Sequence, residues 1–195
     1  MIVRVRLPRG VRWAMLAAAG ATLVVLLFLV APRWFAPAPV APRPEVTSTV
    51  TRTIRATLYY VSPEGTSLVP IDREVPFAEG PVEQAKRIVE AQVAPPPPGH
   101  LSAVPPGTSL RALYIGESRE AYVDLTREIA SGHPGGSLNE ALTVYTIVGV
   151  LTTNLPAIAS VHLLVDGHEV DTLAGHIDLR RPIRPSSEWI AYDTR

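Results

Sequence analysis

Cysteine is absent from this chain of 195 residues, which excludes disulfides, thiolate catalysis and cysteine-ligated metal sites. The N-terminal cysteine that carries the lipid of a lipoprotein is therefore absent too. Net charge is also lacking, because 18 basic residues balance 18 acidic ones. No overall field then attracts nucleic acid, and we predict no nucleic-acid partner. Phosphate-binding loops of the G-x-x-x-x-G-K-[ST] type do not occur, and we predict no cofactor.

Charge is missing altogether from the apolar run at residues 13–31. About 20 such residues span a bilayer core, so the run predicts a transmembrane anchor. The tail before it, residues 1–12, carries four arginines, which places the N-terminus in the cytoplasm and the rest of the chain outside the cell membrane. A cleaved signal peptide with a cleavage motif at 36–38 is one alternative, and a buried helix of a soluble domain is another.

Proline is abundant in residues 32–51, at positions 32, 37, 39, 42 and 44. Proline prevents helix formation and favours an extended, stiff chain. This segment is predicted to be a spacer, followed by a folded domain at 52–183 and a C-terminal tail at 184–195.

Two helical patterns alternate with pairs of strand patterns in the folded part. The expected helices are 81–93 and a segment that begins at Ser137 and ends before Pro156. The expected strands are 54–61, 67–75, 110–115, 120–125, 160–165 and 168–173. This order predicts an α+β fold in which two helices pack on a largely antiparallel sheet, built from a duplicated unit of one helix and one strand pair.

Ser137 and Glu140 have the spacing of a capping box at the start of the second helix. In that arrangement the serine hydroxyl accepts a backbone N–H of the first turn, and the glutamate reaches back to the residue before the helix. We therefore assign both residues a structural role.

The last strand pair surrounds Asp166-Gly167, a two-residue turn that sets Val165 opposite His168 and His162 opposite Asp171. Alternation then places His162 and His168 on opposite faces of the sheet, which argues against a shared metal ion. A one-residue bulge would return them to one face. We predict a structural turn and no metal site.

The loop before the second helix, "SGHPGGS", leads into a helix N-terminus, where free backbone N–H groups can bind an anion. His133, Gly135, Gly136 and Ser137 are therefore the candidate ligand or partner contacts. A flexible loop that needs glycine to reach the helix is the other interpretation. Ser137, His133 and Asp124 could form a hydrolase triad, yet the G-x-S-x-G pattern is absent and we predict no catalytic residue.

Four short motifs follow one another along the chain: Pro105-Pro106-Gly107-Thr108, Val123-Asp124-Leu125, Gly136-Ser137 and Asp166-Gly167. In this order, and over about residues 54–183, the chain resembles the GerMN domain family, the sporulation and spore germination domain. The resemblance implies an α+β domain of bacterial envelope proteins, tethered by a lipoprotein signal or a transmembrane helix, without established catalytic residues. Because this chain has no cysteine, its tether would be the helix itself.

These observations predict a single-pass membrane protein whose extracytoplasmic domain is non-enzymatic. It would bind or assemble with envelope proteins or cell-wall polymer in sporulation, germination or envelope maintenance. The alternative is an extracytoplasmic hydrolase that acts on cell-wall material. Homo-oligomerisation is a further hypothesis, because an open sheet exposes edge strands.

Overall fold

The computed structural model describes residues 52–191 of the chain. The predicted basic tail, membrane anchor and spacer (1–12, 13–31 and 32–51) lie outside the described residues. Within the described part, no helix has both the length and the apolar character needed to cross a membrane.

Two separate sheets form the β structure. The hairpin of β1 (Thr53–Val61) and β2 (Leu68–Pro76) is one of them. The other has four strands in the order β3-β4-β5-β6, namely Leu110–Ile115, Glu120–Leu125, Ser160–Val165 and His168–Glu169. Neighbouring strands in this sheet are antiparallel except β4 and β5, which are parallel.

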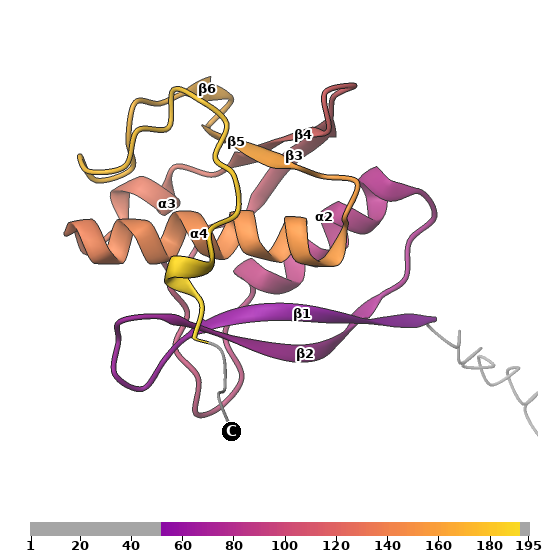
Figure 1. The fold of residues 1–195 in the computed structure, drawn as a ribbon, viewed down its shortest axis with the longest axis horizontal. Helices are drawn as coiled ribbons and strands as arrows, with labels where there is room; N and C mark the ends of the chain where they lie inside the picture. The colour runs from indigo at the N-terminus through magenta and orange to yellow at the C-terminus, as the bar shows by residue number, and fades with distance from the viewer. Residues whose placement is uncertain (1–51, 192–195) are drawn as a thin grey trace, which may run out of the picture. The chain divides into compact units, whose positions relative to one another are not determined.

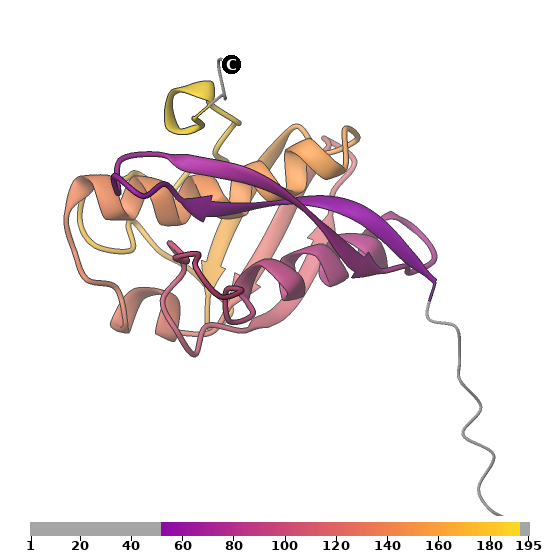
Figure 2. The same cartoon turned by 90° about the horizontal axis from the view of Figure 1, so that it is seen from below.

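The helices lie between the two sheets. Helix α2 (Pro81–Val93) packs against β3, while α4 (Ser137–Asn154) packs against β1 and β5. Figure 1 shows α4 between the β1–β2 hairpin and the larger sheet, and Figure 2 shows the hairpin crossing both helices. A short helix, α3 (Glu128–Ser131), precedes α4, and a 3-10 turn, η1 (Ser187–Trp189), follows the last strand.

The predicted α+β class, both long helices and the largely antiparallel pairing are confirmed, whereas a single sheet is wrong, because the strands form two sheets. The duplicated unit of one helix and one strand pair stays a prediction. The first hairpin forms its own sheet on the far side of the helices. Strands β4 and β5 are parallel because the chain between them returns through α4, the kind of long crossover that parallel neighbours require.

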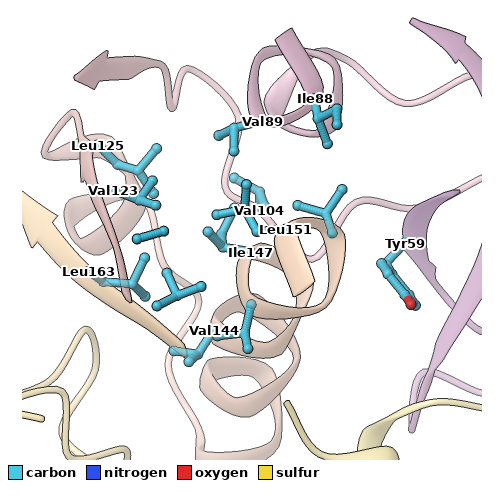
Figure 3. Close-up of a cluster of buried hydrophobic side chains, with 14 of the residues drawn as sticks. Tyr59, Ile88, Val89, Val104, Val123, Leu125, Val144, Ile147, Leu151 and Leu163 are labelled. Carbon is cyan, nitrogen blue, oxygen red and sulfur yellow. The ribbon is translucent and has the colours of Figure 1, made fainter. Parts of the chain in front are cut away.

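Helix α4 provides the centre of the core, since buried residues lie all around it from Glu140 to Leu151. Figure 3 shows its apolar side chains between Val123 and Leu163 of the sheet and Ile88 of α2. On the hairpin side, Gly149 lets the ring of Tyr59 approach closely: a Cβ there would lie 3.2 Å from that ring. The Tyr59 hydroxyl is 2.8 Å from Thr153 Oγ1, so the glycine permits both a close packing and a hydrogen bond.

The chain after β6 crosses the domain and returns to the first hairpin. Ile183 pairs with Val161 on β5, the ring of Trp189 stacks on Tyr145 of α4, and Ala191 N–H donates to Leu68 O of β2. Ile183 therefore contacts the four-stranded sheet, and Trp189 and Ala191 contact α4 and the first hairpin.

Candidate functional site

The glycine-containing loop before α4 is held by His133. The His133 Nδ1 atom accepts the N–H of Gly135 at 2.9 Å, and Nε2 lies 3.2 Å from Thr143 Oγ1 on α4. Because Nδ1 accepts a hydrogen bond, the Nε2 atom carries the proton in the neutral ring and donates it to Thr143. His133 therefore fastens the loop to the helix with both ring nitrogens.

The start of α4 differs from the predicted capping box. Gly136, with a φ of 88°, occupies the cap position, Ser137 is the first helical residue, and no side chain caps the helix. The capping-box prediction for Ser137 and Glu140 is wrong, because the glutamate turns into the protein instead of back toward the loop. Ser137 is exposed. The structure does not test the candidate contact at His133, Gly135, Gly136 and Ser137, and that assignment stays a prediction.

Glu140 is a fully buried carboxylate that holds the segment after β6. Its Oε1 atom accepts the N–H groups of Leu173 and Ala174 at 2.8 and 2.9 Å. Its Oε2 atom accepts the N–H of His176 at 2.8 Å and lies 3.1 Å from the ring Nδ1 of the same histidine. Burial of Glu140 alone would raise the pKa of its carboxyl, but these backbone donors outweigh burial and lower that pKa.

The Asp166-Gly167 turn is confirmed, and it docks on the end of β4. Both turn residues have positive φ angles, and Val165 pairs with His168 as expected. Asp124 Oδ1 accepts the Gly167 N–H at 2.7 Å, and Asp124 Oδ2 lies 3.1 Å from Arg111 Nη1. Two of the motifs behind the family resemblance thus meet in one hydrogen bond.

His162 does not face Asp171, and that part of the predicted register is wrong. Strand β6 ends at Glu169, before the chain could place an aspartate opposite the histidine. Instead His162 is buried on β5, where its ring stacks on Tyr122 and its Nδ1 lies 3.5 Å from Glu120 Oε1. A hydrogen bond to the Glu120 carboxylate raises the pKa of the Tyr122 phenol.

Two residues of the possible triad, Asp124 and His133, make separate contacts. Asp124 binds the Gly167 turn and Arg111, and His133 binds Gly135 and Thr143. In the part of the chain that the structure describes, no cluster of three or more histidine, aspartate or glutamate side chains is arranged to hold a metal ion.

Two carboxamides close the outer edge of β1, a feature that sequence reasoning missed. Gln92 of α2 accepts the N–H and donates to the C=O of Tyr59, both at 2.8 Å. Asn154 of α4 makes the same pair of bonds with Thr57, also at 2.8 Å. One feature of the sequence could have indicated the bonds of Gln92. This residue lies four positions after Ile88, on the buried face of its helix, where a side-chain amide needs hydrogen-bond partners.

A hollow lies beside the C-terminal end of α2. It has a volume of about 640 Å³ and is lined mainly by apolar residues, among them Val93, Pro95, Val104 and Leu110. A smaller hollow of about 240 Å³ continues along β3 and shares Glu90 and Leu110 with the first. The larger of these two hollows therefore offers an apolar surface beside α2.

Comparison with known proteins places this fold. No curated protein matches the chain. The structure titled as the first GerMN domain of the sporulation protein GerM from Bacillus subtilis is similar, with a TM-score of 0.54 and 22% identity over 69% of this chain and 98% of that one. The structure of the tandem GerMN domains of the same protein gives a TM-score of 0.53 and 18% identity over 68% of this chain. The present chain spans only 46% of that tandem structure.

A family model matches the part of the chain that contains Asp124, Gln92 and Asn154 together with their hydrogen-bond partners. This model, Germane, is described as sporulation and spore germination, and it matches residues 57–171. The match extends from β1 to just beyond β6. The chain therefore belongs to the Germane family of sporulation and spore germination domains, the GerMN domain family.

Proposed function

We propose that this chain is a membrane-tethered GerMN domain that binds other envelope components outside the membrane and catalyses no reaction. The proposal is supported by the hydrogen bonds of the domain's polar side chains, which bind groups of the same chain. Glu140, Asp124 and His133 direct their hydrogen bonds to backbone or helix groups of their own chain. Gln92 and Asn154 do the same along β1. Groups held in this way stabilise a scaffold whose surface is available to partners.

The tether is the finer part of this proposal and rests on the sequence. The uncharged run at 13–31 and the arginines before it support a single-pass anchor with a cytoplasmic N-terminus. The family supports a place in sporulation or germination. Envelope maintenance in a cell that forms no spores is the broader role that the same domain would fill.

Crosslinking in the native membrane tests this proposal. The full-length chain should stay in the membrane pellet after an alkaline carbonate wash, and protease added outside the cytoplasmic membrane should digest the domain. A membrane-permeant crosslinker should join it reproducibly to the same envelope protein or to cell-wall polymer. A chain that is released by carbonate, or one that crosslinks to nothing beyond what an unrelated tethered domain captures, would refute the proposal.

A further inference from the structure

One face of the four-stranded sheet points away from the helices and carries a row of aromatic rings. Both long helices and the first hairpin lie on the other side of this sheet (Figure 1). Three residues that pair with one another across the sheet are buried in the core on that side: Leu113, Val123 and Leu163. Because side chains alternate along a strand, their chain neighbours Tyr114, Tyr122 and His162 point to the opposite face, which we call the outward face.

The side chains of the outward face are open to a partner at its β3 and β4 strands. Tyr114 is 64% exposed, and Tyr122 beside it is partly exposed. The Tyr122 ring stacks on His162, with 5.4 Å between the ring centroids. Tyrosine is enriched at protein interfaces because its rigid ring offers a large apolar area together with a polar hydroxyl. Two neighbouring tyrosines therefore give this face the composition of a binding surface.

Two glutamates act on Tyr122 at the outward face. Glu120 precedes Tyr122 by two positions on β4, so it points to the same face. Glu169 of β6 lies opposite Leu164, the next outward residue after His162 on β5. A hydrogen bond to the Glu120 carboxylate raises the pKa of the Tyr122 phenol, and the negative charge of Glu169 adds to that increase. The surroundings of this ring are therefore acidic.

The domain does not balance these two negative charges with a cation of its own. Among residues 52–191, no lysine or arginine forms an ion pair with either glutamate, and Arg184 beside the start of β5 is no exception. Arg111, the arginine of the outward face, pairs with Asp124 at 3.1 Å. Glu120 Oε1 instead lies 3.5 Å from His162 Nδ1. A partner with a positive charge is therefore complementary to this face.

An unpaired nitrogen of His162 lies beneath the same face. His162 is 7% exposed, and its Nε2 atom is buried without a hydrogen-bond partner. When the ring proton lies on Nδ1, toward Glu120, Nε2 is an acceptor that has no donor. Because the Tyr122 ring stacks on His162, a donor from outside reaches this atom only when that ring turns aside. Buried polar atoms are normally paired, so Nε2 is a separate indication that a donor belongs at this place.

We infer that the outward face binds an arginine-bearing segment of a partner protein, whose guanidinium group lies over Tyr122 and is attracted by Glu120 and Glu169. The inference rests on the proposed binding function and names its surface and the chemistry of its partner. A guanidinium group supplies both the missing positive charge and several N–H donors.

Arginine fits this face better than lysine does. Its planar guanidinium group stacks on an aromatic ring and donates to carboxylates at the same time, whereas an ammonium group is a compact point charge. The domain itself contains a contact of this kind, because Arg52 lies over the ring of Phe77 at 4.1 Å from the centroid. Arginine and tyrosine are also enriched among the residues that contribute most to protein interfaces, which favours a protein partner over a glycan polymer.

The test uses the full-length chain in detergent and a phage-displayed library of random twelve-residue peptides as the probe. Selected peptides should contain arginine, and its replacement by citrulline, which removes the charge, should weaken binding by about fivefold or more. The double variant Glu169→Gln/Tyr114→Ala changes two exposed residues and should weaken binding by roughly tenfold. Glu74→Gln/Leu101→Ala makes the same kinds of change at exposed residues elsewhere, and it should alter binding by less than about twofold.

Each other outcome overturns the inference. Selection of no peptide, peptides without arginine, binding that survives citrulline, or equal binding to both double variants would exclude an arginine segment at the outward face. Purified cell-wall sacculi that bind wild type but not Glu169→Gln/Tyr114→Ala would assign the face to polymer. A dimer that this variant dissociates in sedimentation equilibrium would assign it to a second copy. Crosslinking of the same variant in the native membrane separates the two proposals: if its partner is captured as before, the binding function stands and only the assignment to this face fails.

Discussion

Replacing Glu140 with alanine is expected to lower the free energy of unfolding by roughly 3–5 kcal/mol, the largest effect of any single polar substitution in this domain. The variant loses a buried acceptor that serves three backbone N–H groups, those of Leu173, Ala174 and His176. Each N–H left buried without an acceptor costs about 1–3 kcal/mol. Urea denaturation followed by circular dichroism measures the change. Glu83→Ala, an exposed glutamate that pairs with Lys86, is the control and should cost less than about 1 kcal/mol.

Acid should weaken the hydrogen bonds between Glu140 and residues 173–176 in the wild-type protein. The pKa of Glu140 is lower in the folded state than its ordinary value of 4.5, so its contribution is present above pH 4.5 and is lost as pH falls through the folded-state pKa. Glu140→Gln should therefore be less stable than wild type at neutral pH, and the difference should shrink below pH 4.5. Asp178 and Glu128 also titrate in this region, but both proteins retain them. If the free energies of unfolding of wild type and Glu140→Gln differed by the same amount at every pH, the stabilising role of the ionised Glu140 would be contradicted.

Replacing Gln92 with leucine is expected to cost about 2–4 kcal/mol, because leucine keeps the approximate volume but removes the partner of a buried N–H and C=O. Asn154→Leu should cost somewhat less, since its site is only partly buried. Thermal unfolding of both variants measures these losses. Glu90→Leu, at an exposed position of the same helix, is the control. It should change the free energy of unfolding by less than about 1 kcal/mol. A loss for Gln92→Leu no larger than for this control would show that the carboxamides do not hold β1.

The local pattern of the sequence was enough to place most elements. Helix α2 begins at Pro81 and ends at Val93 as predicted, because proline suits the first helical position and a run of prolines follows. Strands β3 and β4 also have the predicted bounds. Apolar periodicity and turn residues act within a few positions of one another, so a single sequence reveals them.

Contacts between distant residues were not predictable in the same way. Glu140 and Leu173 are separated by 33 positions, and no local pattern indicates that a helical glutamate binds a loop so far along the chain. The spacing of Ser137 and Glu140 instead favoured a capping box. Glu140 does not form it, because its carboxylate accepts hydrogen bonds from several backbone N–H groups inside the protein. The bonds of Gln92 and Asn154 to the outer edge of β1 are equally non-local, because they join residues 33 and 97 positions apart.

The claim that this domain binds and does not catalyse is tested most directly by incubating the full-length chain in detergent with labelled peptidoglycan. Wild type should release no more soluble label than a protein-free control, and His133→Ala and Ser137→Ala should release the same amount. Release by wild type that either substitution abolishes, in a variant that still unfolds cooperatively, would contradict a purely binding role and establish a hydrolase site in the loop before α4.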